Sequence, residues 1–237
     1  MPAAFVQQAI GTQGGNGVAV TFGSAVGAGH AIIAVIADLS IGTGTLSVSD
    51  NNGNSYTLGA TLNDATNTTI LFAFAICQNP TLTPNNPPTL TANDSMGSNH
   101  QQMSNWEYSG LTGAMDGQSA SASSSTGSET TSNLTTTVTD VLISVFANGG
   151  NGSYSSGGTG WGHVQIDNTN DQFLFQDQEN VAASTYDGSC TYSLANADWG
   201  GAIAAFKVAA GASFQPDEDF SRLTQPSPPD TNVSLWR

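Results

Sequence analysis

Two carboxylates lie two positions apart in the stretch FQDQEN, and this spacing could support chemistry. Asp177 and Glu179 fall on one face of the chain if the stretch is an extended strand. Paired carboxylates serve as the acid and the nucleophile of a glycosidase, or as two ligands of one ion. The E-x-D-x-x-E pattern of a large jelly-roll glycosidase family does not occur. We therefore interpret both side chains as solvated carboxylates.

Oxygen-bearing side chains also alternate in the loop SDNNGNSY, at Asp50, Asn52 and Asn54. Oxygen ligands at alternate positions around a glycine can surround Ca²⁺. The loop lacks the later bidentate glutamate of an EF-hand, so these residues are weak calcium candidates and a plain turn is expected. Asp167 and Asp171 in DNTNDQ are interpreted in the same way. The sequence predicts no metal site and no cofactor.

Groups for nucleophilic catalysis are dispersed. His30, His100 and His163 are far apart, no G-x-S-x-G elbow occurs, and a triad would need Ser or Cys, His and a carboxylate to converge in space. Cys77 and Cys190 lack a spacing such as C-x-x-C. We expect two separate thiols, with a bridge between them as the alternative. The sequence predicts a protein that is not an enzyme.

Aromatic residues near the Gly-Ser segment 148–160 suggest a surface for sugar binding. Trp161 follows this segment directly, and Tyr154 lies inside it. Exposed aromatic rings on flexible loops can stack on sugars, so these two residues are the possible glycan contacts. Trp106 and Trp199 lie in apolar stretches and are expected in the core.

Charge is distributed unevenly. The formal net charge is −15 although only 9% of residues are charged, which separates the chain from disordered acidic proteins. Lys207 is the first basic residue, so residues 1–206 cannot neutralise phosphates. This excludes nucleic acid as an expected partner, and anionic membranes are disfavoured for the same reason. Such a body attracts basic partners or divalent cations.

Short apolar or alternating runs, separated by Gly, Asn and Asp clusters, indicate an all-β fold. Continuous apolar runs at 30–37 and 68–77 predict strands that are buried on both faces. The segment 45–62 predicts a hairpin around Gly53, which can adopt a positive φ. The Pro-rich segment 78–94 cannot be a central strand.

These elements predict one body, residues 1–208, with a two-sheet β-sandwich of jelly-roll type. Two immunoglobulin-like sandwiches, split in the Pro-rich region at 79–88, are the alternative. Residues 209–237 are expected to form an extended Pro-rich arm.

The arm contains the residue types that dominate protein interfaces, spaced along a stiff, proline-rich segment. It is predicted to dock on other subunits of an assembly or on copies of the same chain, with its arginines on acidic neighbours. The predicted docking residues are Phe220, Arg222, Leu223, Pro226, Pro228, Pro229, Leu235, Trp236 and Arg237.

Two stretches carry a resemblance to a known group of proteins. SVSDNNGNSYTL resembles the V-x-D-x-x-G-N-x-Y hairpin of Gly/Ser/Thr-rich β-sandwich modules in bacterial surface proteins and phage genomes, and NWEYSGLTGAMDGQSASASSSTG resembles their E-Y-S-G-L segment. The resemblance covers 45–146 and implies a β-sandwich in an extracellular or virion setting. It implies no activity and no catalytic residue.

The N-terminal stretch MPAAFVQQAIG lacks the basic and apolar regions of a signal peptide, and no run is apolar enough to span a membrane. A virion protein, made in the host cytoplasm and exposed outside, reconciles this with the composition. We therefore expect a non-enzymatic structural protein of a phage particle, either a capsid decoration or spike-like protein or a tail appendage. The alternative is a carbohydrate-binding or adhesive module outside the cell or on the bacterial surface.

Overall fold

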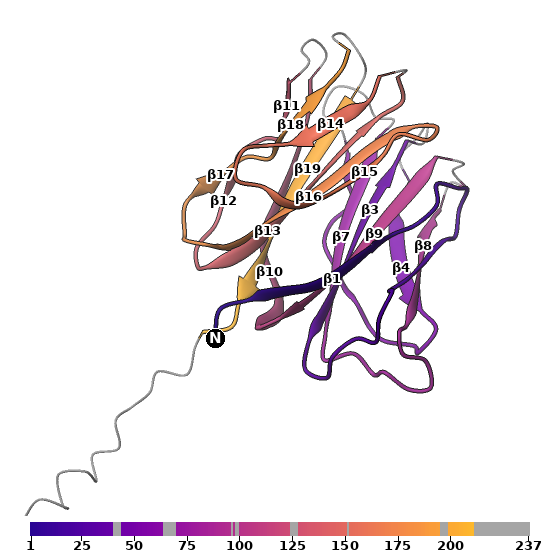
Figure 1. The fold of residues 1–237 in the computed structure, drawn as a ribbon, viewed down its shortest axis with the longest axis vertical. Helices are drawn as coiled ribbons and strands as arrows, with labels where there is room; N and C mark the ends of the chain where they lie inside the picture. The colour runs from indigo at the N-terminus through magenta and orange to yellow at the C-terminus, as the bar shows by residue number, and fades with distance from the viewer. Residues whose placement is uncertain are drawn as a thin grey trace, which may run out of the picture.

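A computed structural model gives the fold of the chain (Figure 1). The structure describes residues 1–39, 44–63, 70–95, 97, 100–123, 128–150, 152–194 and 199–210. Within these residues every regular element is a β-strand. The predicted all-β sandwich is confirmed.

The strands divide into a first half, up to Ser109, and a second half, from Leu111. The first half contains β1 Ala4–Ile10, β2 Val18–Thr21, β3 Ala31–Asp38, β4 Leu46–Asp50, β5 Thr57–Leu58, β6 Leu62–Asn63, β7 Leu71–Gln78, β8 Thr89–Asp94 and β9 Gln101–Ser109. The second half contains β10 Leu111–Ser123, β11 Ser128–Thr130, β12 Leu134–Thr135, β13 Asp140–Asn148, β14 Tyr154–Gly157, β15 Gly162–Asp167, β16 Gln172–Val181, β17 Thr185–Tyr186, β18 Ser189–Tyr192 and β19 Trp199–Val208.

The two halves repeat the same strand order. The large sheet of the first half runs β1-β9-β3-β7-β5, with β6 also on β7, and that of the second half runs β10-β19-β13-β16-β15. Each half adds a smaller sheet, β2-β8-β4 in the first and β11-β18-β14 in the second, while the second half alone carries the pair β12-β17. The chain is therefore an internal structural repeat, and the two halves lie side by side in Figure 1.

One shared core joins the two large sheets face to face. Ile33, Phe74 and Trp106 of the first half lie in the same buried cluster as Val145 and Phe175 of the second. These side chains are fully buried, and each contributes about 1.5–3 kcal/mol of transfer free energy. Neither large sheet could keep this face in water, so the halves form one body.

The opposite face of each large sheet is covered by a smaller sheet. Ile32, Ile36 and Leu71 pack against β2, β4 and β8, and Phe146 and Leu174 pack against β14 and β18. Every residue of β3 is buried because this strand lies between two layers. This is the physical reason for the continuous apolar run at 30–37, and the prediction of a strand buried on both faces is confirmed there and in β7 up to Cys77.

Two local predictions are wrong. Residues 45–62 form no hairpin, because β4 pairs with β8 of the small sheet and β5 pairs with β7 of the large one. Gly53 has the expected positive φ, but its turn carries the chain between sheets.

The prediction for 78–94 fails at its end, where β8 is the middle strand of the small sheet. The segment 79–88 lies within the first half, so it does not divide two sandwiches; the repeat changes over at Gly110.

The shared core predicts that neither half is stable alone. Chains of residues 1–110 and 111–210, produced separately, should aggregate or stay unfolded, because each exposes its half of the core. Produced together they should form a one-to-one complex that elutes from a sizing column at the position of the 1–210 chain. Two separately folded, soluble monomers would contradict this account of the body.

Candidate functional site

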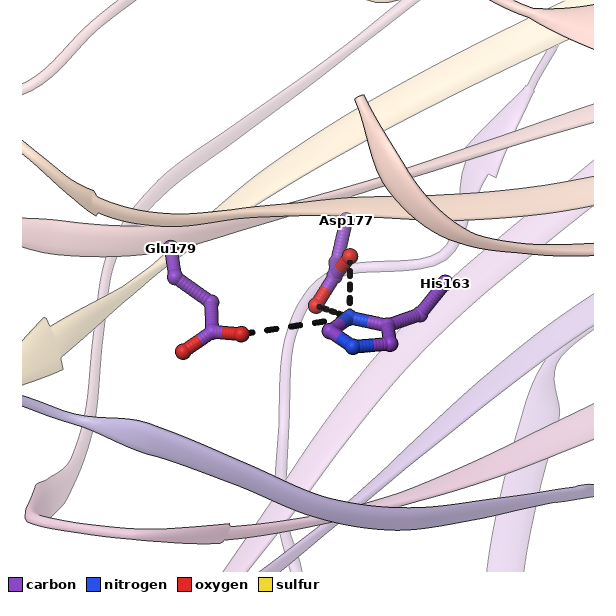
Figure 2. Close-up of side chains that lie close together, drawn as sticks. All are labelled: His163, Asp177 and Glu179. Atoms are coloured by element: carbon purple, nitrogen blue, oxygen red, sulfur yellow. Dashed lines mark hydrogen bonds and ion pairs between the residues drawn. The ribbon is translucent and has the colours of Figure 1, made fainter. Parts of the chain in front are cut away.

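A cluster of ionisable side chains lies where the two halves meet at the β15-β16 edge. His163 comes from β15, and Asp177 and Glu179 come from β16. The His163 Nδ1 atom lies 2.9 Å from each Asp177 carboxylate oxygen and 3.9 Å from Glu179 Oε1. Figure 2 shows both carboxylates directed at this one nitrogen. We call these three residues the seam cluster.

The first half supplies the other contacts of the seam cluster. The Tyr108 hydroxyl of β9 donates a hydrogen bond to Asp177. The Phe5 ring of β1 stacks on the His163 imidazole, with centroids 3.6 Å apart, and the Phe5 backbone N–H donates to Glu179 Oε2 at 3.3 Å. Four segments from both halves therefore converge on the cluster.

The solvent exposure of the side chains increases across the cluster from the core side to the surface side. Asp177 is 1% exposed and Tyr108 is fully buried, whereas the side chains of His163 and Glu179 are 36% and 29% exposed. Burial and the neighbouring charge of Asp177 raise the pKa of Tyr108 well above its ordinary value, so its hydroxyl stays protonated and remains a donor. A Cβ at Gly162 would lie 3.2 Å from Asp177 Oδ1, so the glycine allows the close approach of β15.

The sequence pattern anticipated only part of this cluster. Strand β16 continues through Val181, so Asp177 and Glu179 lie on one strand as the spacing required. The interpretation of both as solvated carboxylates is wrong for Asp177, which is buried. His163, Tyr108 and Phe5 were not connected with the pair, and no spacing along the chain signals their approach.

The calcium candidates Asp50, Asn52 and Asn54 form a turn whose side-chain oxygens accept hydrogen bonds from the protein itself. Asp50 Oδ1 accepts from the backbone N–H groups of Asn52 and Asn54, and Oδ2 accepts from the Asn54 amide and the Tyr56 hydroxyl. The side-chain Oδ1 atoms of Asn52 and Asn54 accept hydrogen bonds from the backbone N–H groups of Asn85 and Thr81, respectively, in the Pro-rich segment. Burial opposes ionisation of Asp50, but these donors outweigh it and keep its pKa below the ordinary value. The turn therefore ties the Pro-rich segment to β4.

Replacement of Asp50 tests this structural role. Asp50→Ala removes a carboxylate with four donors and should lower the free energy of unfolding by about 2–4 kcal/mol in urea titrations. Ca²⁺ should leave the unfolding midpoint of the parent chain unchanged. The exposed Asp187→Ala serves as the matched control. Stabilisation by Ca²⁺ that Asp50→Ala abolishes would show that the turn binds the ion.

The two predicted glycan contacts lie in different places. Tyr154 is 3% exposed, and its hydroxyl donates to Glu129 at 2.8 Å inside the core, so its prediction as a glycan contact is wrong. Trp161 is half-buried and packs against a separate cluster that contains Leu142 and Val181. The structure does not bring the two aromatic rings into one platform.

Glu129 is a fully buried carboxyl group. The Tyr154 hydroxyl, the Asn148 amide and the Cys190 thiol all donate to it. Burial raises the pKa of Glu129 to about 7, although these donors lower it in part. Burial and the charge of Asp116 likewise raise the pKa of the buried Asp140 to about 7. The folded chain therefore binds more protons than the unfolded chain between about pH 4.5 and 7.

Stability should consequently fall as the pH rises through this window. In Glu129→Gln the decrease in unfolding free energy between pH 5 and pH 8 should be smaller by about 2 kcal/mol. Urea unfolding at several pH values measures this, with the exposed Asp187→Asn as the control. An unchanged pH profile in Glu129→Gln would contradict the raised pKa.

The cysteines are separate. Cys77 in β7 and Cys190 in β18 are both buried free thiols. They belong to different halves, which agrees with the prediction of two thiols and excludes the bridge in this structure.

The chain ends of the body meet around an apolar hollow. The hollow has a volume of about 810 Å³, and Met1, Pro2, Val138 and Val208 are among its lining residues. Met1 is 85% exposed and Val138 is 41% exposed. Figure 1 shows the N-terminus beside the end of β19.

Lys207 also lines the hollow, and its ammonium group lies 3.0 Å from Asp116 Oδ1. Burial opposes ionisation of Asp116, yet hydrogen bonds from Thr137 and the Lys207 charge hold its pKa at about 2. The first basic residue of the sequence is thus already paired within the body.

The predicted docking residues of the arm, from Phe220 to Arg237, lie outside the described residues. No helix that could cross a membrane occurs in the part of the chain that the structure describes. No protein-family model, curated protein or solved structure matches the chain.

Proposed function

We propose that this chain is a non-enzymatic structural protein of a phage particle, anchored to neighbouring subunits through its C-terminal arm and the end of the body where Met1 lies beside the end of β19. The observation that carries the proposal is the apolar hollow at that end. Val138 and Met1 expose large apolar side chains there, and Ala209 and Ala210, the first two residues of the arm, line the same hollow. An exposed apolar surface of this kind favours contact with another protein.

The construction of the body supports a structural role. Its large sheets are covered on both faces, and its core is shared by two repeats, which favours a rigid unit. Anchoring at that end would leave the opposite end, with the β11-β18-β14 sheet, directed away from the attachment (Figure 1). A decoration or spike-like protein and a tail appendage both require this polarity.

A carbohydrate-binding or adhesive module remains the alternative. Trp161 keeps part of its ring at the surface beside the Gly-Ser segment, and it is the residue that would contact a glycan. Loss of glycan binding in Trp161→Ala would support that function. The two functions are compatible if the particle contacts its host through this protein.

Incorporation into particles tests the anchor. A chain that ends at residue 210, and the full chain with Val138→Asp, should each assemble at least tenfold less than the parent chain. Val6→Asp is the matched control, because Val6 is 43% exposed but does not line the hollow. Circular dichroism confirms that the variants are folded.

Trypsin gives an independent measurement. Residues 1–206 contain no site for it, and Lys207 lies in β19 with its side chain bound to Asp116, so cleavage reports on Arg222. Cleavage there should be slower in the assembled particle than in the free chain. Normal incorporation of both the truncated chain and Val138→Asp, with equal cleavage in both states, would refute the anchor.

A further inference from the structure

We propose that the seam cluster binds one divalent transition-metal ion of the zinc class, with His163, Asp177 and Glu179 as its ligands. The inference is independent of the proposed function. It concerns how the two halves are joined at one end of their shared core.

The donor atoms fit a single ion. One imidazole nitrogen and two carboxylate groups are ligands that zinc accepts, and all three donor atoms lie within 4.8 Å of one another. Ligands of one zinc ion, at bond lengths of about 2.0–2.2 Å, lie roughly 3–3.5 Å apart. The Nδ1 distances of 2.9 Å to Asp177 and 3.9 Å to Glu179 need only small side-chain movements to meet that spacing.

A water ligand would reach the ion from the partly exposed side of the cluster. His163 and Glu179 face solvent in part, whereas Asp177 is held from the core side by Tyr108. A hydrogen bond to a ligating carboxylate from a buried hydroxyl orients that ligand. The cluster therefore has three donors, a fixed outer contact and an open position.

The internal repeat shows that the fold does not require polar side chains at the positions of the seam cluster. Ala31, Ile33, Val35 and Ala37 of β3 correspond to Val141, Ile143, Val145 and Ala147 of β13, since both sets face the shared core. Ile33 pairs with Ile76 on β7, whereas Ile143 pairs with Asp177 on β16.

The same comparison places Tyr108 opposite Ala31 and Phe206 opposite Val141. The halves therefore meet at two equivalent edges of the shared core. At one edge the corresponding positions hold the apolar residues Ile76 and Phe206, and at the other they hold Asp177 and Tyr108. Because this fold accepts apolar side chains at the equivalent positions, the buried carboxylate of Asp177 needs a specific explanation.

A buried carboxylate needs a compensating positive charge or several donors. Residues 1–206 contain no lysine or arginine, and Lys207 is bound to Asp116. Among the described residues, no lysine or arginine is therefore left to pair with Asp177, whose contacts there are the Tyr108 hydroxyl and the His163 ring. A bound cation would supply that charge. A chain with a net charge of −15 also attracts divalent cations from solution. Glu179 Oε1, 3.9 Å from the His163 Nδ1 atom, and the partly exposed side of the cluster favour the ion.

Such an ion would join the halves. Phe5 stacks on the His163 ring and donates its N–H to Glu179, while Tyr108 donates to Asp177, so β1 and β9 contact all three ligands. Fixing the ligands would fix the edge strand β1 against β15 and β16. Binding should accordingly raise the unfolding temperature of the whole body.

Titration calorimetry on the full, untagged chain, stripped with a chelator, tests the proposal with Zn²⁺ as the probe. We expect one Zn²⁺ per chain and a rise in unfolding temperature that the chelator reverses. Glu179→Gln introduces the residue type of Gln78, its counterpart on β7, and should weaken binding more than about tenfold, as should His163→Ala. His100→Ala is the control, because His100 is exposed, pairs with Asp171 outside the cluster and should leave Zn²⁺ affinity unchanged.

The double variant Tyr108→Phe/Asp177→Ile copies the apolar edge. It should fold with an unfolding temperature, in the absence of metal, equal to or above that of the parent, and it should lose Zn²⁺ binding and the metal-induced rise. No binding by the parent chain at millimolar Zn²⁺ would overturn the proposal. Parent-like affinity in His163→Ala and Glu179→Gln, or in the folded double variant, would overturn it equally.

Discussion

The structure depends on burying one apolar face of each large sheet against that of the other. Side chains from β3, β7 and β9 meet those from β13, β16 and β19 in a single cluster, and these strands hold the largest buried rings among the described residues. Every other layer is attached to the outside of this pair. Because the two faces come from different halves, the interaction that stabilises the molecule also makes the halves inseparable.

The outer layers follow from the same constraint. A sheet whose central strands are apolar on both sides must be covered twice, and the small sheets supply the second cover. Carboxyl groups in these outer layers have different pKa values. Hydrogen-bond donors keep the pKa of Asp50 below its ordinary value, whereas burial raises the pKa of Glu129 to about 7.

Sequence reasoning succeeded where burial alone determines the pattern. The runs around Ile33, Phe74 and Val145 predicted central strands correctly, because two apolar faces leave no alternation to misread. It failed for two-residue strands such as β5 and β12, which are too short to show a period. It also failed at Gly53, since the same turn chemistry serves a hairpin or a crossing between sheets. The repeat itself is a correspondence of strand order and register, which is visible only once the pairing is known. The positions of Tyr108 and Phe5 at the seam cluster likewise become visible only once the strand pairing is known.

Covalent fusion of the two repeats has a consequence for how they can change. In a symmetric dimer of one such half, the same residue would occupy both ends of the interface, and each substitution would act twice. Within one chain, Ile76 and Asp177 occupy corresponding places yet are encoded separately. One end of the interface can therefore retain the packing that holds the body together, while the other is free to acquire polar groups without placing the whole fold at risk.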